Sequence, residues 1–176
     1  ESPDSHPILT RSTDGGKTWT VEGPVDPAWR PGIGYTETGF ISRAVDGSLF
    51  CRGAHWVRDP ADPDAPLVHP ETLGMRDNAV LLRRSPDGGR NWSAPVVLPK
   101  PYPTPLEVPT GLVPLADGTL LCSSSTWRDW DGGCPYHHRV STLRSTDNGA
   151  SWSGPIDIFH DPSGRRGFWE GRIAQL

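Results

Sequence analysis

Ser85-Pro86-Asp87-Gly88-Gly89-Arg90-Asn91-Trp92 is the stretch that decides the fold, because the chain carries two more copies of its pattern. One copy runs from Ser12 to Trp19 and the other from Ser145 to Trp152. All three read Ser-x-Asp-x-Gly-x-x-Trp. A pattern that recurs at long intervals indicates an array of similar supersecondary units.

Each copy is predicted to be the turn of a β-hairpin. The second copy lies between the strand-like runs 78–84 and 94–98, and Asp-Gly or Asn-Gly supplies the turn. The Asp and Ser side chains can accept backbone N–H bonds across that turn. Burying about 150–250 Å² of tryptophan ring stabilises by at most roughly 4–6 kcal/mol per copy. We therefore expect a structural role for Ser12, Asp14, Gly16, Trp19, Ser85, Asp87, Gly89, Trp92, Ser145, Asp147, Gly149 and Trp152.

A second repeat lies between these turns. Residues 39–51 and 111–122 both read as strand, Asp-Gly turn and strand, each ending on a cysteine. One unit therefore consists of strand, Asp-Gly turn, strand, long polar loop, strand, octapeptide and strand. Four antiparallel strands per unit are typical of a β-propeller blade.

The two repeats together predict an all-β fold, a partial β-propeller of four-stranded antiparallel blades forming a single domain over residues 1–176. Blades 37–99 and 108–160 are complete, 7–24 supplies the last two strands of another, and 168–176 begins an inner strand of the next. Propellers close with about 4–8 blades. We therefore expect further blades in a longer parent chain, or self-association through open strand edges.

The octapeptide resembles the Asp-box, or BNR repeat, of sialidases and related β-propeller glycosidases. The resemblance covers nearly the whole chain and implies hydrolysis of a terminal glycosidic bond, with sialic acid the first guess for the sugar. It also implies an extracellular or periplasmic protein. In that family the box is a structural turn remote from the substrate, which agrees with the role predicted above.

The resemblance also implies roles for individual residues. In the family a Glu ahead of an inner strand polarises a Tyr nucleophile, and three Arg residues clamp the substrate carboxylate. Glu170 is the candidate for that Glu, Arg76 and Arg172 are candidates for the clamp, and Asp77 or Asp59 is the candidate acid/base. Residues 1–176 offer no counterpart of the Tyr nucleophile or of the full clamp.

The long loops, rather than the short turns, are where we expect the site. Glu37, Glu107 and Glu170 each lie near the start of an inner strand, so their carboxylates are expected to converge on a central pocket. Long loops on a rigid scaffold carry function. Aromatic rings and charged groups suit a glycan, which adds His55, Trp56, Trp127 and Arg128 as substrate-binding candidates.

Composition limits the remaining functions. A net charge of −4 over 176 residues argues against a nucleic-acid partner, and no run is long and apolar enough to span a membrane. No cysteine or histidine spacing indicates a metal, and no cofactor is expected. The expected partner is a glycan or glycoconjugate.

Two alternatives remain open. The same fold serves as a carbohydrate- or protein-binding propeller without catalysis, because fold does not fix function. It also serves as another glycan-active enzyme with paired carboxylates and no Arg clamp. We expect residues 1–176 alone to be inactive.

Overall fold

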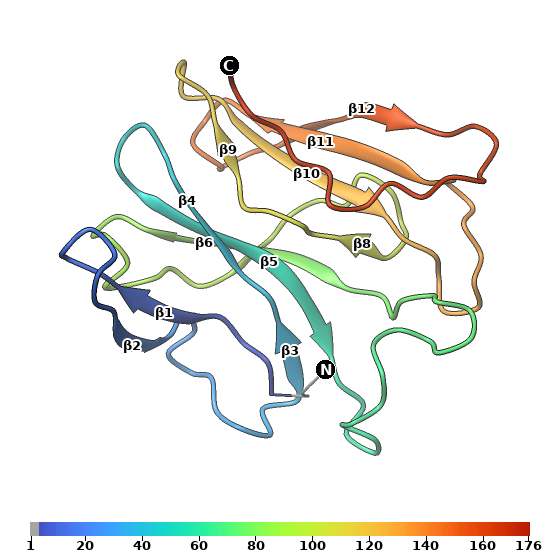
Figure 1. Ribbon diagram of the computed structural model, residues 1–176, viewed down its shortest axis with the longest axis horizontal. Helices are drawn as coiled ribbons and strands as arrows, with labels where there is room; N and C mark the ends of the chain where they lie inside the picture. Colours follow the sequence, from blue (N-terminus) through green and yellow to red (C-terminus); the bar gives the residue numbers. More distant parts are fainter. Residues whose placement is uncertain (1–3) are drawn as a thin grey trace.

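A computed structural model describes residues 4–176, and every regular element in that range is a strand. The chain begins with an antiparallel hairpin, β1 (Ile8–Arg11) and β2 (Thr20–Pro24), which projects from one end of the molecule (Figure 1). Two larger sheets follow in sequence. The expectation of an all-β, antiparallel architecture is confirmed.

The first sheet is four strands wide, because two of its five short elements lie end to end along the same edge. Its elements are β3 (Tyr35–Glu37), β4 (Phe40–Arg43), β5 (Leu49–Val57), β6 (Ala79–Ser85) and β7 (Val96–Val97). β3 and β4 share one edge of β5, β6 pairs with the other edge, and β7 pairs with β6, all antiparallel.

β3 and β4 form one interrupted strand along the edge of β5. Between them the backbone comes very close to β5. The carbonyl oxygen of Thr38 lies so near Gly53 that an added Cβ would sit 1.7 Å from it. Thr38 Oγ1 meanwhile accepts the backbone N–H of Ala54 at 3.0 Å. Only glycine fits at residue 53.

The second sheet repeats the arrangement. It contains β8 (Leu106–Glu107), β9 (Val113–Pro114), β10 (Leu120–Thr126), β11 (Arg139–Ser145) and β12 (Ser153–His160). β8 and β9 share one edge of β10, and β11 and β12 follow on the other side. Neither sheet closes on itself within the described residues.

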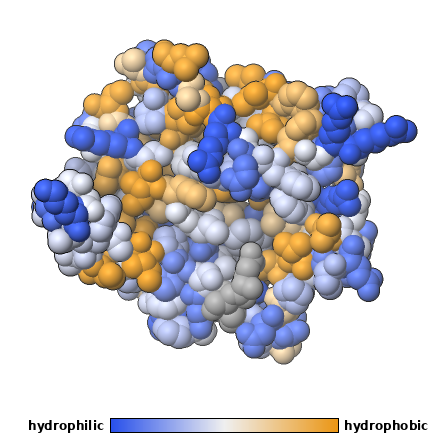
Figure 2. Space-filling model, in the orientation of Figure 1, coloured by the Kyte–Doolittle hydropathy of each residue, from blue (hydrophilic) through white to orange (hydrophobic). Residues whose placement is uncertain are grey.

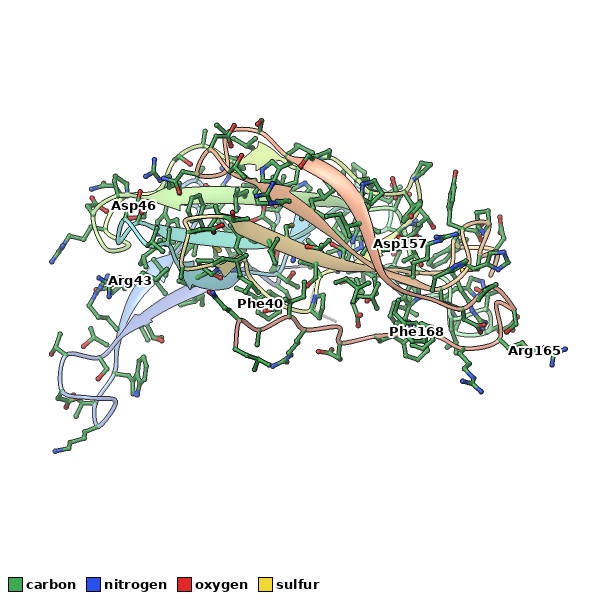
Figure 3. All side chains as sticks on the ribbon, turned by 90° about the horizontal axis from the view of Figure 1, so that it is seen from above. Phe40, Arg43, Asp46, Asp157, Arg165 and Phe168 are labelled. Carbon is green, nitrogen blue, oxygen red and sulfur yellow. The ribbon has the colours of Figure 1, made fainter. Side chains whose placement is uncertain are left out.

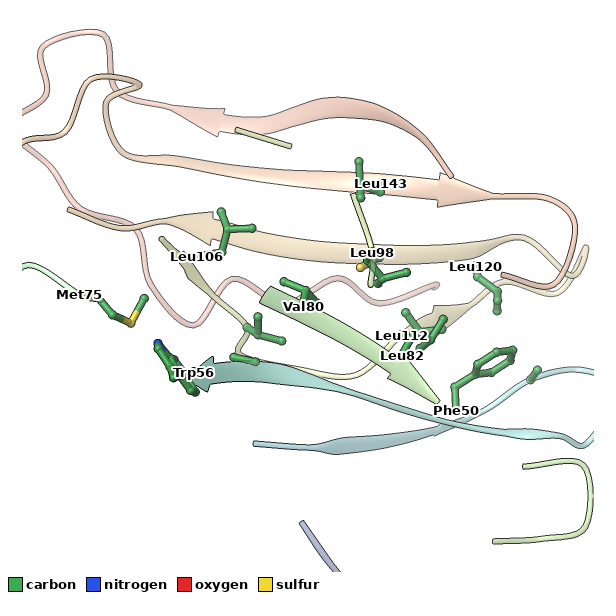
Figure 4. Packing of buried hydrophobic residues seen from close by; sticks show 14 of the residues in the cluster. Phe50, Trp56, Met75, Val80, Leu82, Leu98, Leu106, Leu112, Leu120 and Leu143 are labelled. Carbon is green, nitrogen blue, oxygen red and sulfur yellow. The ribbon is translucent and has the colours of Figure 1, made fainter. Parts of the chain in front are cut away.

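The hydrophobic core lies between the two sheets (Figure 4). Phe50, Trp56 and Leu82 enter it from the first sheet, and Leu120 and Leu143 from the second. Alternate residues of a strand point to opposite faces, so one face of each sheet supplies the shared core. The outer surface is mixed, with apolar patches between hydrophilic side chains (Figure 2).

The three octapeptides form the predicted turns. In the second, Asp87 Oδ1 accepts the backbone N–H groups of Arg90 (3.1 Å) and Asn91 (2.9 Å). Ser85 Oγ accepts from Gly89 N at 2.8 Å, and Gly89 has a φ of 88°. The copies around Asp14 and Asp147 repeat these contacts. Backbone bonds therefore occupy these carboxylates, as a structural role requires.

The prediction that every octapeptide tryptophan is buried is wrong for Trp19, which is 63% exposed. Trp152 packs against the core instead. The third octapeptide lies against Phe50 of the preceding sheet, and the second against Arg11 of the preceding hairpin. The first has no preceding sheet among the described residues, so its ring stays in solvent.

The predicted inner strand over residues 168–176 is also absent, because the structure has no strand there. The segment runs alongside the second sheet, and from Phe168 onward it is visible beside the strands (Figure 3). Ser123 Oγ donates to the carbonyl of Gly171 at 3.4 Å, and Ala116 N donates to Gln175 Oε1 at 2.9 Å. These contacts hold the segment against the sheet, but among the described residues it forms no backbone ladder with a strand.

Candidate functional site

A cavity of about 310 Å³ opens between the two sheets where their inner strands begin. Trp56 and Met75 line it from the first sheet and its loop. Leu106 and Glu107 line it from β8, and Trp127 follows β10. Glu170 completes the wall from the C-terminal segment. Four of the predicted site residues thus meet in one place: Trp56, Glu107, Trp127 and Glu170.

Glu107 and Glu170 touch directly. The backbone N–H of Glu170 donates to Glu107 Oε2 at 2.9 Å. Burial raises the pKa of Glu107, and the nearby charge of Glu170 adds to that rise against the lowering effect of the hydrogen bond. Carboxyl groups with raised pKa values serve as proton donors near neutral pH.

Local geometry of the C-terminal segment positions Glu170. Glu170 has a φ of 57°, an uncommon conformation for a residue with a side chain. The preceding Trp169 stacks on Trp127, with ring centroids 4.9 Å apart. Arg172 Nη2 lies 3.6 Å from Glu170 Oε2, and both side chains are largely exposed. Strained backbone of this kind concentrates at functional sites.

Glu37 does not share this cavity. Arg83 Nη1 donates to Glu37 Oε2 at 3.0 Å, and His55 Nδ1 lies 2.9 Å from Glu37 Oε1. Arg83 also reaches Asp26, which accepts a 2.9 Å bond from the Tyr35 hydroxyl. Burial and the Asp26 contact raise the pKa of Tyr35 to about 12. This network joins the first sheet to the residues that follow β2.

A one-residue difference in register separates the two glutamates. Cys51 and Cys122 hold equivalent places on β5 and β10. Glu37 pairs with His55, four residues after Cys51, whereas Glu107 pairs with Ser125, three residues after Cys122. The pairing of Glu37 is therefore shifted by one residue. Because a shift of one residue turns a side chain to the other face, Glu37 points towards β1–β2 and Glu107 towards the C-terminal segment.

The predicted clamp and acid/base residues lie apart from Glu107. Arg76 stacks over Trp130 at 4.5 Å and donates from Nε to the carbonyl of Pro66 at 3.0 Å. Asp77 is 77% exposed and pairs with Lys100. Asp59 lines a separate hollow of about 480 Å³. Of the two predicted clamp residues, only Arg172 is near a cavity carboxylate.

The remaining candidates are placed as follows. His55 belongs to the Glu37 network, with its ring 4.9 Å from Tyr35. Arg128 is exposed in the loop after β10, where its carbonyl accepts the backbone N–H of Met75 at 3.0 Å.

Over residues 4–176, no three His, Cys, Asp or Glu side chains are grouped to hold a metal ion. No helix in that range is long and apolar enough to cross a membrane.

Sequence reasoning missed Trp169, Arg83 and Arg52. The signal for Trp169 was present, since it directly precedes Glu170. Arg83 and Arg52 are buried within strands, at 5% and 0% exposure. A basic residue in an alternating strand is normally assigned to the solvent face, so no sequence signal distinguished them.

Comparison with known proteins agrees with the hairpin geometry. The family described as "BNR/Asp-box repeat" matches residues 10–21, which hold the first octapeptide. This chain carries the BNR/Asp-box repeat. The resemblance of the first octapeptide to the Asp-box is thereby confirmed. The comparison with curated proteins gave no match.

Two solved structures are similar in fold to this chain. A crystal structure of a protein of unknown function from Dyadobacter fermentans DSM 18053 has a TM-score of 0.65 and 23% identity, over 91% of this chain. The Hadza microbial sialidase Hz136 has a TM-score of 0.54 and 24% identity, over 82% of this chain. The aligned region spans 46% and 30% of those two chains, less than half of either.

Proposed function

We propose that this protein is a sialidase-like glycoside hydrolase that removes a terminal sugar at the cavity between its two sheets. The observation that carries the proposal is the contact of Glu107, a carboxyl with a raised pKa, with Glu170 beside tryptophan rings. Glycoside hydrolysis generally uses two carboxyl groups around the scissile bond. Tryptophan rings supply the apolar face on which a sugar ring packs.

The two carboxyl groups take different roles in this proposal. Glu107 retains its proton to higher pH and donates it to the oxygen of the leaving group, so that the glycosidic C–O bond breaks. Glu170 is more exposed and faces the cavity as a carboxylate. Its negative charge stabilises the positive charge that develops on the sugar ring. A water molecule then adds to the anomeric carbon, and the proton that it loses passes to the Glu107 carboxylate, which restores the acid.

The wider architecture belongs to the same proposal. The two sheets and the first hairpin are blades of a sialidase-like propeller, and the complete ring includes further blades or other chains. The family resemblance implies sialic acid as the sugar and an extracellular or periplasmic location. Sialosides therefore belong in the first panel of substrates.

Hydrolysis of fluorogenic aryl glycosides tests the enzyme. The panel holds α-sialosides with uncharged, amino and acidic hexosides, assayed on the longest natural form of the protein that contains residues 1–176. We expect turnover of at least one substrate, and a loss of about 100-fold or more in Glu107→Gln. Glu71→Gln, the same change at an exposed loop residue, is the matched control. Turnover that survives Glu107→Gln unchanged contradicts the proposal.

A glycan-binding propeller without catalysis is the second candidate. The stacking of Trp169 on Trp127 favours it, because an exposed aromatic surface holds a sugar without any proton transfer. Saturable binding of a glycan, with no turnover of any substrate in the panel, would identify this function. Another glycan-active propeller enzyme would instead show turnover of hexosides alone.

A further inference from the structure

A second hollow, of about 430 Å³, opens beside the cavity between the sheets. Asp77 and Lys100 line it from the loops of the first sheet, and Thr104 and Trp130 line it from the loops of the second. Met75 lines both hollows, so they share a wall. We infer that this outer groove binds the second sugar of an oligosaccharide whose terminal sugar occupies the cavity. The inference rests on the proposed function and adds to it a site for the leaving group.

The backbone leads from the outer groove directly to Glu107. Pro105 lines the groove, and the next two residues, Leu106 and Glu107, line the cavity. In the proposed reaction Glu107 protonates the oxygen that joins the terminal sugar to the next one, so the next sugar must lie near Glu107. The cavity and the groove each have a volume within the range of about 300–1,000 Å³ that is typical of small-molecule sites. The groove therefore lies where the leaving group needs a site.

Hydrogen bonds between the loops hold the walls of the outer groove in place. The backbone N–H of Met75 donates to the carbonyl of Arg128 at 3.0 Å, which ties the loop of the first sheet to that of the second. Thr104 Oγ1 donates to the carbonyl of Trp127 at 3.1 Å. A site that is formed before its ligand arrives loses less conformational entropy on binding. The groove is thus a preformed surface rather than a gap between mobile loops.

Trp130 supplies an aromatic ring to the outer groove. The guanidinium carbon of Arg76 lies 4.5 Å from its ring centroid, and the His69 ring meets it edge-on with centroids 4.9 Å apart. The Trp130 carbonyl also accepts a 2.8 Å bond from Thr72 Oγ1. A ring held in this way offers its apolar surface to the C–H side of a sugar ring. Arg76, which was predicted to clamp a carboxylate, is here a positioning residue for Trp130.

An ion pair supplies hydrogen-bonding groups beside that ring. Lys100 Nζ bonds the Asp77 carboxylate and donates to the carbonyl of Thr104 at 3.2 Å. The Asp77 side chain is 77% exposed, so its oxygens remain accessible to a ligand. A sugar hydroxyl both donates and accepts, so neighbouring hydroxyls can bond the carboxylate and the ammonium group together. Asp77, which was predicted as an acid/base, is here a ligand for the second sugar.

Ligands that share a terminal sugar but differ in length test the inference. Methyl α-sialoside is compared with sialyllactose, methyl β-galactoside with lactose, and methyl N-acetyl-β-glucosaminide with di-N-acetylchitobiose. Isothermal titration calorimetry on the longest natural form of the protein that contains residues 1–176 measures each Kd. We expect the oligosaccharide of at least one pair to bind about tenfold or more tightly than its methyl glycoside. Equal binding within every pair overturns the inference, as does the absence of binding in all three.

Variants of the outer groove link that advantage to its residues. Trp130→Ala should reduce it to about twofold or less and leave binding of the methyl glycoside unchanged, whereas Trp130→Phe, which keeps a ring, should retain most of it. Trp19→Ala, at a tryptophan that is 63% exposed, is the matched control. Lys100→Met should lower the advantage to about threefold, and it carries the test if circular dichroism shows that Trp130→Ala is unfolded. An advantage that survives these changes in the groove overturns the inference.

The same measurements separate this inference from the proposed function. Tighter binding of an oligosaccharide that depends on Trp130, without turnover of any substrate, supports the inference and counts against hydrolysis. Turnover of an aryl glycoside that is lost in Glu107→Gln, without any advantage for the oligosaccharides, supports hydrolysis and overturns the inference.

Discussion

Arg52 of β5 donates from Nη2 to Ser124 Oγ of β10 at 2.6 Å and so joins the two sheets. Its Nη1 donates to the carbonyl of Thr110 at 2.9 Å. The side chain is fully buried, its hydrogen-bond partners are a carbonyl and a hydroxyl rather than a carboxylate, and burial lowers its pKa. Because Thr110 follows Glu107 by three residues, Arg52 anchors the segment that carries the candidate acid.

Truncating Arg52 should destabilise the protein. Arg52→Ala leaves a cavity, and it leaves the Thr110 carbonyl and the Ser124 hydroxyl without their hydrogen-bond donor. We expect the free energy of unfolding to fall by about 3 kcal/mol. Arg52→Met fills the space without a buried charge, so it should cost less than about 1.5 kcal/mol. Urea unfolding of both variants measures the difference. A larger loss in Arg52→Met than in Arg52→Ala would contradict this account.

The buried pair Glu37–Arg83 should show strong coupling. The two side chains are 3% and 6% exposed. Removing Glu37 leaves the buried Arg83 with only Asp26, at 3.3 Å, and removing Arg83 leaves the buried Glu37 with only His55. We expect Glu37→Gln and Arg83→Met each to cost about 3–5 kcal/mol, and the double variant to cost clearly less than their sum.

The neighbouring pair Arg84–Asp46 provides the control for that cycle. Its side chains are 43% and 42% exposed, and its coupling energy should be below about 1 kcal/mol. Additive effects at Glu37 and Arg83 would show that the buried contact does not stabilise the fold.

The octapeptide tryptophans should differ in their effect on stability. Trp152 packs against the core, so Trp152→Ala should cost about 2–3 kcal/mol. Trp19 is 63% exposed, and Trp19→Ala should cost less than about 0.5 kcal/mol. Chemical unfolding of each variant gives these values. Equal losses would mean that Trp19 is buried by a partner in solution.

Asp147 should make stability depend on pH. Hydrogen bonds from the Ser151 side chain and backbone, and from Ser145, lower the pKa of Asp147 to about 2, against about 3.9 when unfolded. A lowered folded pKa contributes stability above the unfolded value, and this is lost as pH falls through the folded value. Thermal unfolding from pH 7 to pH 2 should therefore show Asp147→Asn less stable at pH 7.

That deficit should shrink between about pH 4 and pH 2, because the wild-type carboxylate is being protonated there. Asp131→Asn, in an exposed loop, is the matched control and should follow the wild type. A deficit that stays constant across this range would assign the effect of Asp147→Asn to something other than charge.

Glu170 should tune the pH dependence of catalysis. Burial first, and the charge of Glu170 as well, raise the pKa of Glu107. Because the proposed acid must be protonated, the rate should fall as pH rises through this pKa. Glu170→Gln removes the raising charge, so the falling limb should move to lower pH. A pH–rate profile of kcat/KM for both proteins measures the shift, and a shift to higher pH would contradict it.

The sequence by itself determined the repeating scaffold. Local chemistry explains this success: Asp-Gly turns, alternating strands and the hydrogen-bonding reach of Asp87 and Ser85 act within a few residues of each other. The same local signals placed Trp56 and Trp127 at equivalent distances beyond Cys51 and Cys122, and both tryptophans line the cavity. They also predicted that Glu107 and Glu170 would lie at one pocket, and both line this cavity.

Only the tertiary structure decided which side chains meet. One residue of register sends Glu37 to Arg83 and Glu107 to Glu170, and that register is set by pairing across strands far apart in the sequence. Burial of Arg52 and exposure of Trp19 likewise depend on whether another sheet lies across them. Long-range packing fixes these outcomes, and a local pattern carries no record of it.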